Sequence, residues 1–210
     1  RDLRMSRGLG DVYKRQCTTG PYELYVPVCR WKEFIMKLKT RDIVYIGFIA
    51  ALCAVATTIR IEIPGGAMVH LGSAALFTTS ILFGGLYGGL GAAIGSALFD
   101  LFGGHTQYIV FSFFIKGIAG LIVGGMTAGY LPPSINKPTA SFGRILVALI
   151  IGAIWTAFGY FIAWWFVLNS AAVAASKIQY SLITSAAGII VAIVLTPKLQ
   201  KIVRRLFTKN

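Results

Sequence analysis

Residues 70–117 have the sequence HLGSAALFTTSILFGGLYGGLGAAIGSALFDLFGGHTQYIVFSFFIKG. It is mostly apolar and rich in small residues, yet it contains the acid Asp100, the base Lys116 and the histidines His70 and His105. An ionisable group inside a bilayer is costly unless it is paired or faces an interior cavity. The segment therefore predicts a polar site inside an apolar membrane protein.

The composition of the whole chain supports this prediction. Of 210 residues, 56% are hydrophobic and 13% are charged, with a mean hydropathy of +0.74, whereas soluble proteins are about a quarter charged. The net charge of +13 comes mostly from helix ends and loops, so it indicates membrane topology rather than nucleic-acid binding. The three cysteines share no motif spacing, which argues against a disulfide framework or a zinc site.

The first 35 residues differ from the rest of the chain. They are polar, show no helical hydrophobic stripe and hold four of the seven acids. Met36 then begins a short basic lead into an apolar run, as in many bacterial inner-membrane proteins. We expect residues 1–35 to be a non-native extension, with a disordered cytoplasmic tail as the alternative, and residues 36–210 to form one membrane domain.

Counting the spans decides the fold class. Apolar runs at 43–59, 108–130, 145–168 and about 178–195 each suit one crossing, the last ending before Pro197. The run at 71–104 corresponds to roughly 50 Å of helix, too long for one crossing and too short for two full ones. The positive-inside rule favours an even count, so we predict two short helices there, meeting near residues 84–89. The prediction is an all-α membrane protein with six transmembrane helices and both termini cytoplasmic, in which residues 60–69 form an extracytoplasmic loop.

The sequence lacks the motifs that several classes of enzyme require. The chain has no GxxxxGK[ST], HExxH or GxSxG motif, and only three acids follow Met36, so it offers no paired carboxylates. We therefore predict that the protein is not an enzyme and uses neither a cofactor nor a metal. A small membrane protein without an energy source is expected to bind a solute and take energy from partner subunits.

The acid and the base of the central segment allow two interpretations. A turn at Gly103 and Gly104 would bring Asp100 and Lys116, on antiparallel helices, toward each other. The pair would then either polarise a substrate site or form a structural salt bridge that locks the two helices.

Polar and aromatic residues near one end of the later helices complete a candidate pocket. Their mix of rings and hydrogen-bonding groups suits a flat, neutral heterocycle, although lipid anchoring is the alternative role of the aromatic residues. The predicted substrate-binding residues are His70, Asp100, Tyr108, Ser112, Lys116, Trp165, Asn169, Gln179 and Thr184.

The run at 70–104, followed by IKGIAGLIVG, resembles the substrate-binding S component of energy-coupling factor (ECF) transporters, and among these the hydroxymethylpyrimidine-type branch. The resemblance implies a multi-pass protein of the bacterial cell membrane with an outward pocket for a small water-soluble vitamin or precursor. Hydroxymethylpyrimidine or pyridoxine is expected ahead of riboflavin or pantothenate. The implied partners are a membrane-embedded T component and two ATPase subunits, with no nucleic acid.

The same resemblance assigns roles to particular residues. Asp100 and Lys116 match the acid and the Lys-Gly of the family's central block, whereas Trp164 stands where many relatives have glutamate. On the first helix, a small-residue face is implied to dock the T component, with an internal helix contact as the alternative. This face consists of Gly47, Ala50, Ala51 and Ala54, of which Ala50 and Ala54 match the AxxxA docking motif.

A protein of another class stays open as an alternative. A stand-alone secondary transporter or channel would use Asp100 and Lys116 as a coupling relay and would show inverted internal repeats. The sequence shows no convincing repeat.

Overall fold

The computed structural model describes residues 40–63, 67–130 and 140–207. The predicted N-terminal extension, residues 1–35, lies outside the described residues. The chain divides into two compact units, Arg1–Ile43 and Val44–Asn210. Apart from the first four residues of one helix, every described element belongs to the second unit.

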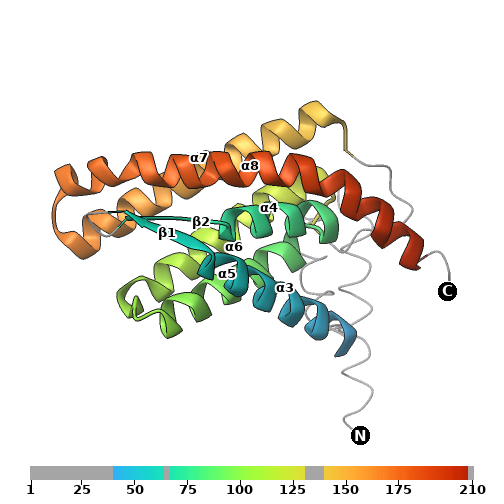
Figure 1. Ribbon diagram of the computed structural model, residues 1–210, viewed down its shortest axis with the longest axis horizontal. Helices are drawn as coiled ribbons and strands as arrows, with labels where there is room; N and C mark the ends of the chain where they lie inside the picture. Colours follow the sequence, from blue (N-terminus) through green and yellow to red (C-terminus); the bar gives the residue numbers. More distant parts are fainter. Residues whose placement is uncertain (1–39, 64–66, 131–139, 208–210) are drawn as a thin grey trace, which may run out of the picture. The chain divides into compact units, whose positions relative to one another are not determined.

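Six α-helices, a short 3-10 turn and a two-stranded hairpin make up the described residues (Figure 1). In chain order these elements are α3 (Thr40–Thr58), β1 (Arg60–Ile63), β2 (Ala67–His70), α4 (Gly72–Phe83), α5 (Gly85–Phe102), η2 (Thr106–Tyr108), α6 (Ile109–Thr127), α7 (Phe142–Leu168) and α8 (Ala171–Phe207).

The predicted pair of helices in the 71–104 region is confirmed. Gly84 separates α4 from α5 with a φ of 87°, a left-handed conformation that glycine adopts without steric cost. The 12 residues of α4 span about 18 Å, well short of a hydrocarbon core of about 30 Å. The other five helices are long and apolar enough to cross a membrane, so the described part of the chain is a six-helix, all-α membrane protein.

Glycines bring α5 unusually close to its neighbours. A Cβ added at Gly120 of α6 would lie 2.6 Å from the Cα of Gly89, and one added at Gly89 would lie 2.8 Å from the carbonyl oxygen of Gly117. On another face of α5, a Cβ at Gly95 would lie 2.9 Å from Cβ of Cys53 in α3. Because lipid supplies no hydrophobic drive between helices, such backbone contact is what holds them together.

The segment expected to be an irregular loop forms a β-hairpin instead. Strands β1 and β2 are antiparallel, with Arg60 opposite His70, and the backbone N–H of Leu71 donates to the carbonyl of Ile59 at 3.2 Å. The β-branched residues Ile61, Ile63 and Val69 favour strand over coil. The Pro and Gly residues at 64–66, which indicated a loop, lie outside the described residues.

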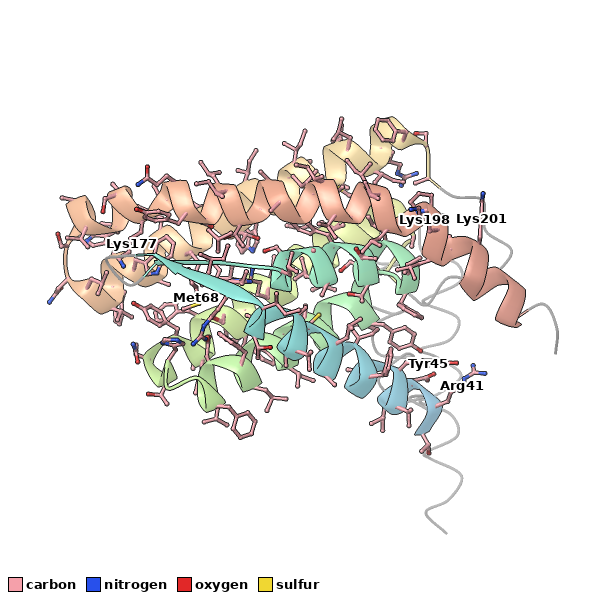
Figure 2. All side chains as sticks on the ribbon, viewed as in Figure 1. Arg41, Tyr45, Met68, Lys177, Lys198 and Lys201 are labelled. Atoms are coloured by element: carbon pink, nitrogen blue, oxygen red, sulfur yellow. The ribbon has the colours of Figure 1, made fainter. Side chains whose placement is uncertain are left out.

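The prediction that Pro197 ends the last helix is wrong. Helix α8 begins at Ala171 and continues past Pro197 to Phe207. Figure 2 shows Lys198 and Lys201 toward one end of α8 and Lys177 at the other. By the positive-inside rule the end with Lys198 and Lys201 is cytoplasmic, which places the hairpin and Lys177 on the outer side.

We predict that the contact between α5 and α6 does not tolerate a single methyl group at Gly120. Gly120→Ala forces the two backbones apart, so the purified protein should lose about 1–3 kcal/mol of stability, seen as a lower thermal midpoint in detergent. The matched control is Gly143→Ala on α7, where an added Cβ meets nothing within 4 Å. Equal midpoints for the two variants would contradict this account of the packing.

Candidate substrate-binding site

A cavity of about 130 Å³ lies among the helices toward the Lys177 end of α8. Side chains from β2 and from all six helices line it. Its wall combines aromatic rings, small hydroxyls and ionisable groups, the pattern of a site that binds an apolar ring and orients it by a few polar contacts.

Lys116 is the central cation of the cavity. Its side chain is only 5% exposed, and the ammonium donates a hydrogen bond to Oγ of Ser73 in α4 at 3.1 Å. The same ammonium lies 5.3 Å from the centre of the Tyr160 ring of α7, within cation–π range. The hydroxyl of Tyr160 in turn shares a hydrogen bond of 3.1 Å with Ser112. Lys116 therefore joins α4, α6 and α7 at the cavity wall.

Asp100 faces the same cavity but is not paired with Lys116. Among the described residues no ion pair joins the two side chains, so the predicted salt bridge that would lock the helices is absent there. The carboxylate is 8% exposed, and its buried Oδ2 receives no hydrogen bond from any described group. Nε2 of the neighbouring His105 is likewise buried without a partner. The wall thus holds polar atoms whose hydrogen-bonding capacity is unused.

His70 ends strand β2 beside these groups. The backbone N–H of Gly72 donates to Nδ1 of His70 at 3.1 Å, so that nitrogen acts as an acceptor and the ring is neutral. Burial, together with the charges of Lys116 and Arg60, lowers the pKa of His70 to about 3. The imidazole is therefore uncharged at neutral pH.

The structure brings together most, but not all, of the predicted substrate-binding residues. Those on the cavity wall are His70, Asp100, Tyr108, Ser112, Lys116 and Thr184. Trp165 is 52% exposed, Gln179 is exposed, and Asn169 adopts a left-handed conformation where α7 ends. None of these three lines the cavity.

Trp165 and Gln179 each lie one residue away from a residue that lines the cavity. Trp164 and Tyr180, their immediate neighbours, line the cavity, because each step along a helix turns the side chain by about 100°. Trp164 lies four residues after Tyr160, with the ring centres 5.6 Å apart. Trp165 has the same spacing from Phe161. The signal that distinguishes Trp164 is therefore the series Thr156, Tyr160 and Trp164, in which polar and aromatic residues repeat every four positions.

Small polar residues of the wall were missed by the sequence analysis. Examples are Thr57 of α3, Ser73 of α4, Thr156 of α7 and Ser185 of α8. The signal was again spacing: Thr156 precedes Tyr160 by four residues, and Ser181 precedes Ser185 by four. Within the described part of the chain, no cluster of His, Cys, Asp and Glu is suited to a metal ion.

The residues predicted to dock a partner lie on two different faces of α3. Gly47 and Ala51 are exposed and Ala54 is half-buried, and a Cβ at Gly47 would meet nothing within 4 Å. Ala50 is only 3% exposed, because its backbone lies against Gly91 and Gly95 of α5. The internal helix contact, which the sequence left open, applies to Ala50.

Comparison with known proteins identifies related families and folds. Residues 37–201 match the family model described as ECF-type riboflavin transporter, S component. A Pyrococcus woesei protein, described as an uncharacterized protein in the gap 3' region, is 30% identical over 142 residues, which are 67% of this chain and 88% of that protein. The solved structure described as the S component of a bacterial ECF transporter has a TM-score of 0.62 at 19% identity, covering 79% of this chain and 99% of that chain.

These comparisons correct the predicted branch. The matched model is of the riboflavin type, so the expected hydroxymethylpyrimidine-type branch is wrong. The glycine-rich block that carried the resemblance packs the helices together, as at Gly89 and Gly120. Such a block specifies the fold, and it says little about the ligand held between the helices.

Acidification should destabilise the protein through His70. The unfolded chain takes up a proton near pH 6.5, whereas folded His70 resists protonation down to about pH 3. Stability is therefore complete above pH 6.5 and falls as the pH drops below it, by about 1.4 kcal/mol per pH unit. His70→Asn keeps an acceptor for the Gly72 N–H but does not titrate. Thermal midpoints between pH 7.5 and 5 should fall more steeply for the wild-type protein than for this variant; parallel curves would refute the assignment.

Proposed function

Because the chain belongs to the family of S components of ECF-type riboflavin transporters, we propose that it captures riboflavin or a close flavin analogue at the outer face of the cell membrane. The protein is a transport component rather than an enzyme. The observation that carries the proposal is a cavity walled by aromatic rings and polar groups at the end of the bundle away from Lys198 and Lys201.

The chemistry of the wall suits a planar, uncharged ring system. Tyr108, Tyr160 and Trp164 supply aromatic surface, and stacked rings gain about 0.5–1.5 kcal/mol beyond the burial of their area. The formal charges of Asp100 and Lys116 cancel, and His70 is neutral. A ligand with no net charge therefore enters without leaving an unbalanced buried charge.

The energy for release is proposed to come from other subunits. The chain carries no Walker motif for nucleotide phosphates, so ATP hydrolysis is assigned to two ATPase subunits that act through a membrane-embedded T component. The exposed small residues Gly47 and Ala51 on α3 form a flat strip on which another helix can pack closely. We assign docking of the T component to this strip, and a packing role inside the protein to Ala50.

Substitution of two adjacent tryptophans tests the capture site. The wild-type protein in detergent should quench the fluorescence of riboflavin on binding, and hydroxymethylpyrimidine should not displace the flavin. Trp164→Leu removes a wall of the cavity and should weaken binding about tenfold. Trp165→Leu, its neighbour on the exposed face, should bind as the wild type does. Equal effects of the two changes, or displacement by the single-ring compound, would contradict the proposal.

Three alanine-to-leucine changes test the docking strip. Ala51→Leu should abolish co-purification with the T component and the ATPases while riboflavin affinity stays within about twofold of the wild type, because the added bulk lies outside the fold. Ala50→Leu should instead lower the thermal midpoint, since that site is packed against α5. Ala175→Leu places the same change on an exposed face of α8 and should have neither effect. If Ala51→Leu still co-purifies with the T component and the ATPases, the strip is not the docking surface.

A further inference from the structure

Asp100 presents the cavity with a hydrogen-bond acceptor that the protein leaves unused. Its side chain is more than nine-tenths buried and lines the cavity, and no described group donates to Oδ2. A carboxylate oxygen can only accept. A buried acceptor of this kind requires a donor from water or from the ligand, and a ligand that supplies the donor gains affinity from it.

Lys116 presents a donor of opposite charge to the same cavity. An ammonium group has three N–H donors, and the described contacts of Lys116 are one hydrogen bond to Ser73 and the face of Tyr160. It therefore has donor capacity left for a ligand. Close packing of glycines on α5 and α6 fixes the backbones that carry both residues: Gly95 precedes Asp100 by five residues, and Gly117 follows Lys116 directly.

In the described part of the chain, Asp100 and Lys116 do not form a salt bridge that stabilises the fold. Among the described residues no ion pair joins them, and the contact between α5 and α6 is already made by glycine backbones such as Gly89 and Gly120. A salt bridge is thus not needed to hold the helices together. Because both side chains line the same cavity, one edge of a ligand can contact both.

We propose that Asp100 and Lys116 together recognise the imide edge of a flavin, an inference that rests on the function proposed above. The imide of the flavin ring has one N–H, at N3, between two carbonyl groups. Oδ2 of Asp100 accepts the hydrogen bond from N3, and the ammonium of Lys116 donates to a flanking carbonyl oxygen. The planar ring then lies against the aromatic wall that includes Tyr160 and Trp164.

Methylation of N3 removes the donor without changing the ring, so it isolates the contact with Asp100. The experiment measures the affinities of riboflavin and of N3-methylriboflavin by fluorescence quenching with the purified full chain. In the wild-type protein, methylation should weaken binding at least tenfold. In Asp100→Leu, riboflavin should bind at least tenfold more weakly than to the wild type, and the two flavins should differ by less than threefold.

Three further variants keep the result interpretable. Asp100→Asn keeps an acceptor oxygen and should retain most of the methylation penalty even if Asp100→Leu folds poorly. Lys116→Met should weaken both flavins while preserving the penalty, because its contact is with a carbonyl. Leu101→Ala, next to Asp100 but 50% exposed and outside the cavity wall, should match the wild type.

The possible failures are distinguishable. If the wild-type protein binds no riboflavin, the proposed function falls and this inference falls with it. If riboflavin binds but N3-methylation weakens binding as much in Asp100→Leu as in the wild type, another group accepts the hydrogen bond from N3. The function then stands and the assignment of Asp100 is overturned.

Discussion

The structure depends on how closely the backbone of α5 approaches its neighbours. Glycines on separate faces of this helix meet Gly120 of α6 and Cys53 of α3 at distances that leave no room for a methyl group. In water, apolar burial would hold such helices together, but lipid is as apolar as the helices themselves, so packing contacts must do so. Close contact also fixes the relative rotation of the helices. Asp100 and Lys116 therefore face one cavity without being bonded to each other.

This arrangement explains how the apolar bundle accommodates charge. Lys116 makes a hydrogen bond to Ser73 and lies over the ring of Tyr160, which offset part of the cost of removing an ammonium from water. The carboxyl group of Asp100 interacts with Ser112, but its Oδ2 has no donor within the described part of the protein. Natural proteins violate the rule that buried polar groups are satisfied mainly where they function. Lys116 thus has contacts within the protein, whereas Oδ2 of Asp100 has no hydrogen-bond donor among the described residues. This difference indicates a role in ligand binding rather than in stability.

The sequence predicted those features that depend on length, charge balance and residue type. Two short helices meeting near residues 84–89 followed from the length of the apolar run and the positive-inside rule. It was less informative where tertiary contacts decide. Trp165 and Gln179 were predicted, whereas their neighbours Trp164 and Tyr180 line the cavity, because a composition argument does not fix the rotation of a helix. Pro197 was taken to end α8, yet the helix continues to Phe207, since a proline inside a membrane helix is tolerated where neighbouring groups satisfy the backbone carbonyl that it frees.

The charge balance of the cavity also bears on the source of energy. A membrane potential of 100 mV does about 2.3 kcal/mol of work for each charge that crosses. A flavin without net charge, held between an acid and a base whose formal charges cancel, carries no charge across, and neutral His70 adds none. The potential can therefore drive neither capture nor release. A relay based on Asp100 and Lys116, as in a stand-alone secondary transporter, would need one of these groups to exchange a proton or cation during transport, whereas Lys116 is already held by Ser73 and Tyr160. Under the proposed function the site serves to bind the flavin, and we assign the work of emptying it to partner subunits that hydrolyse ATP.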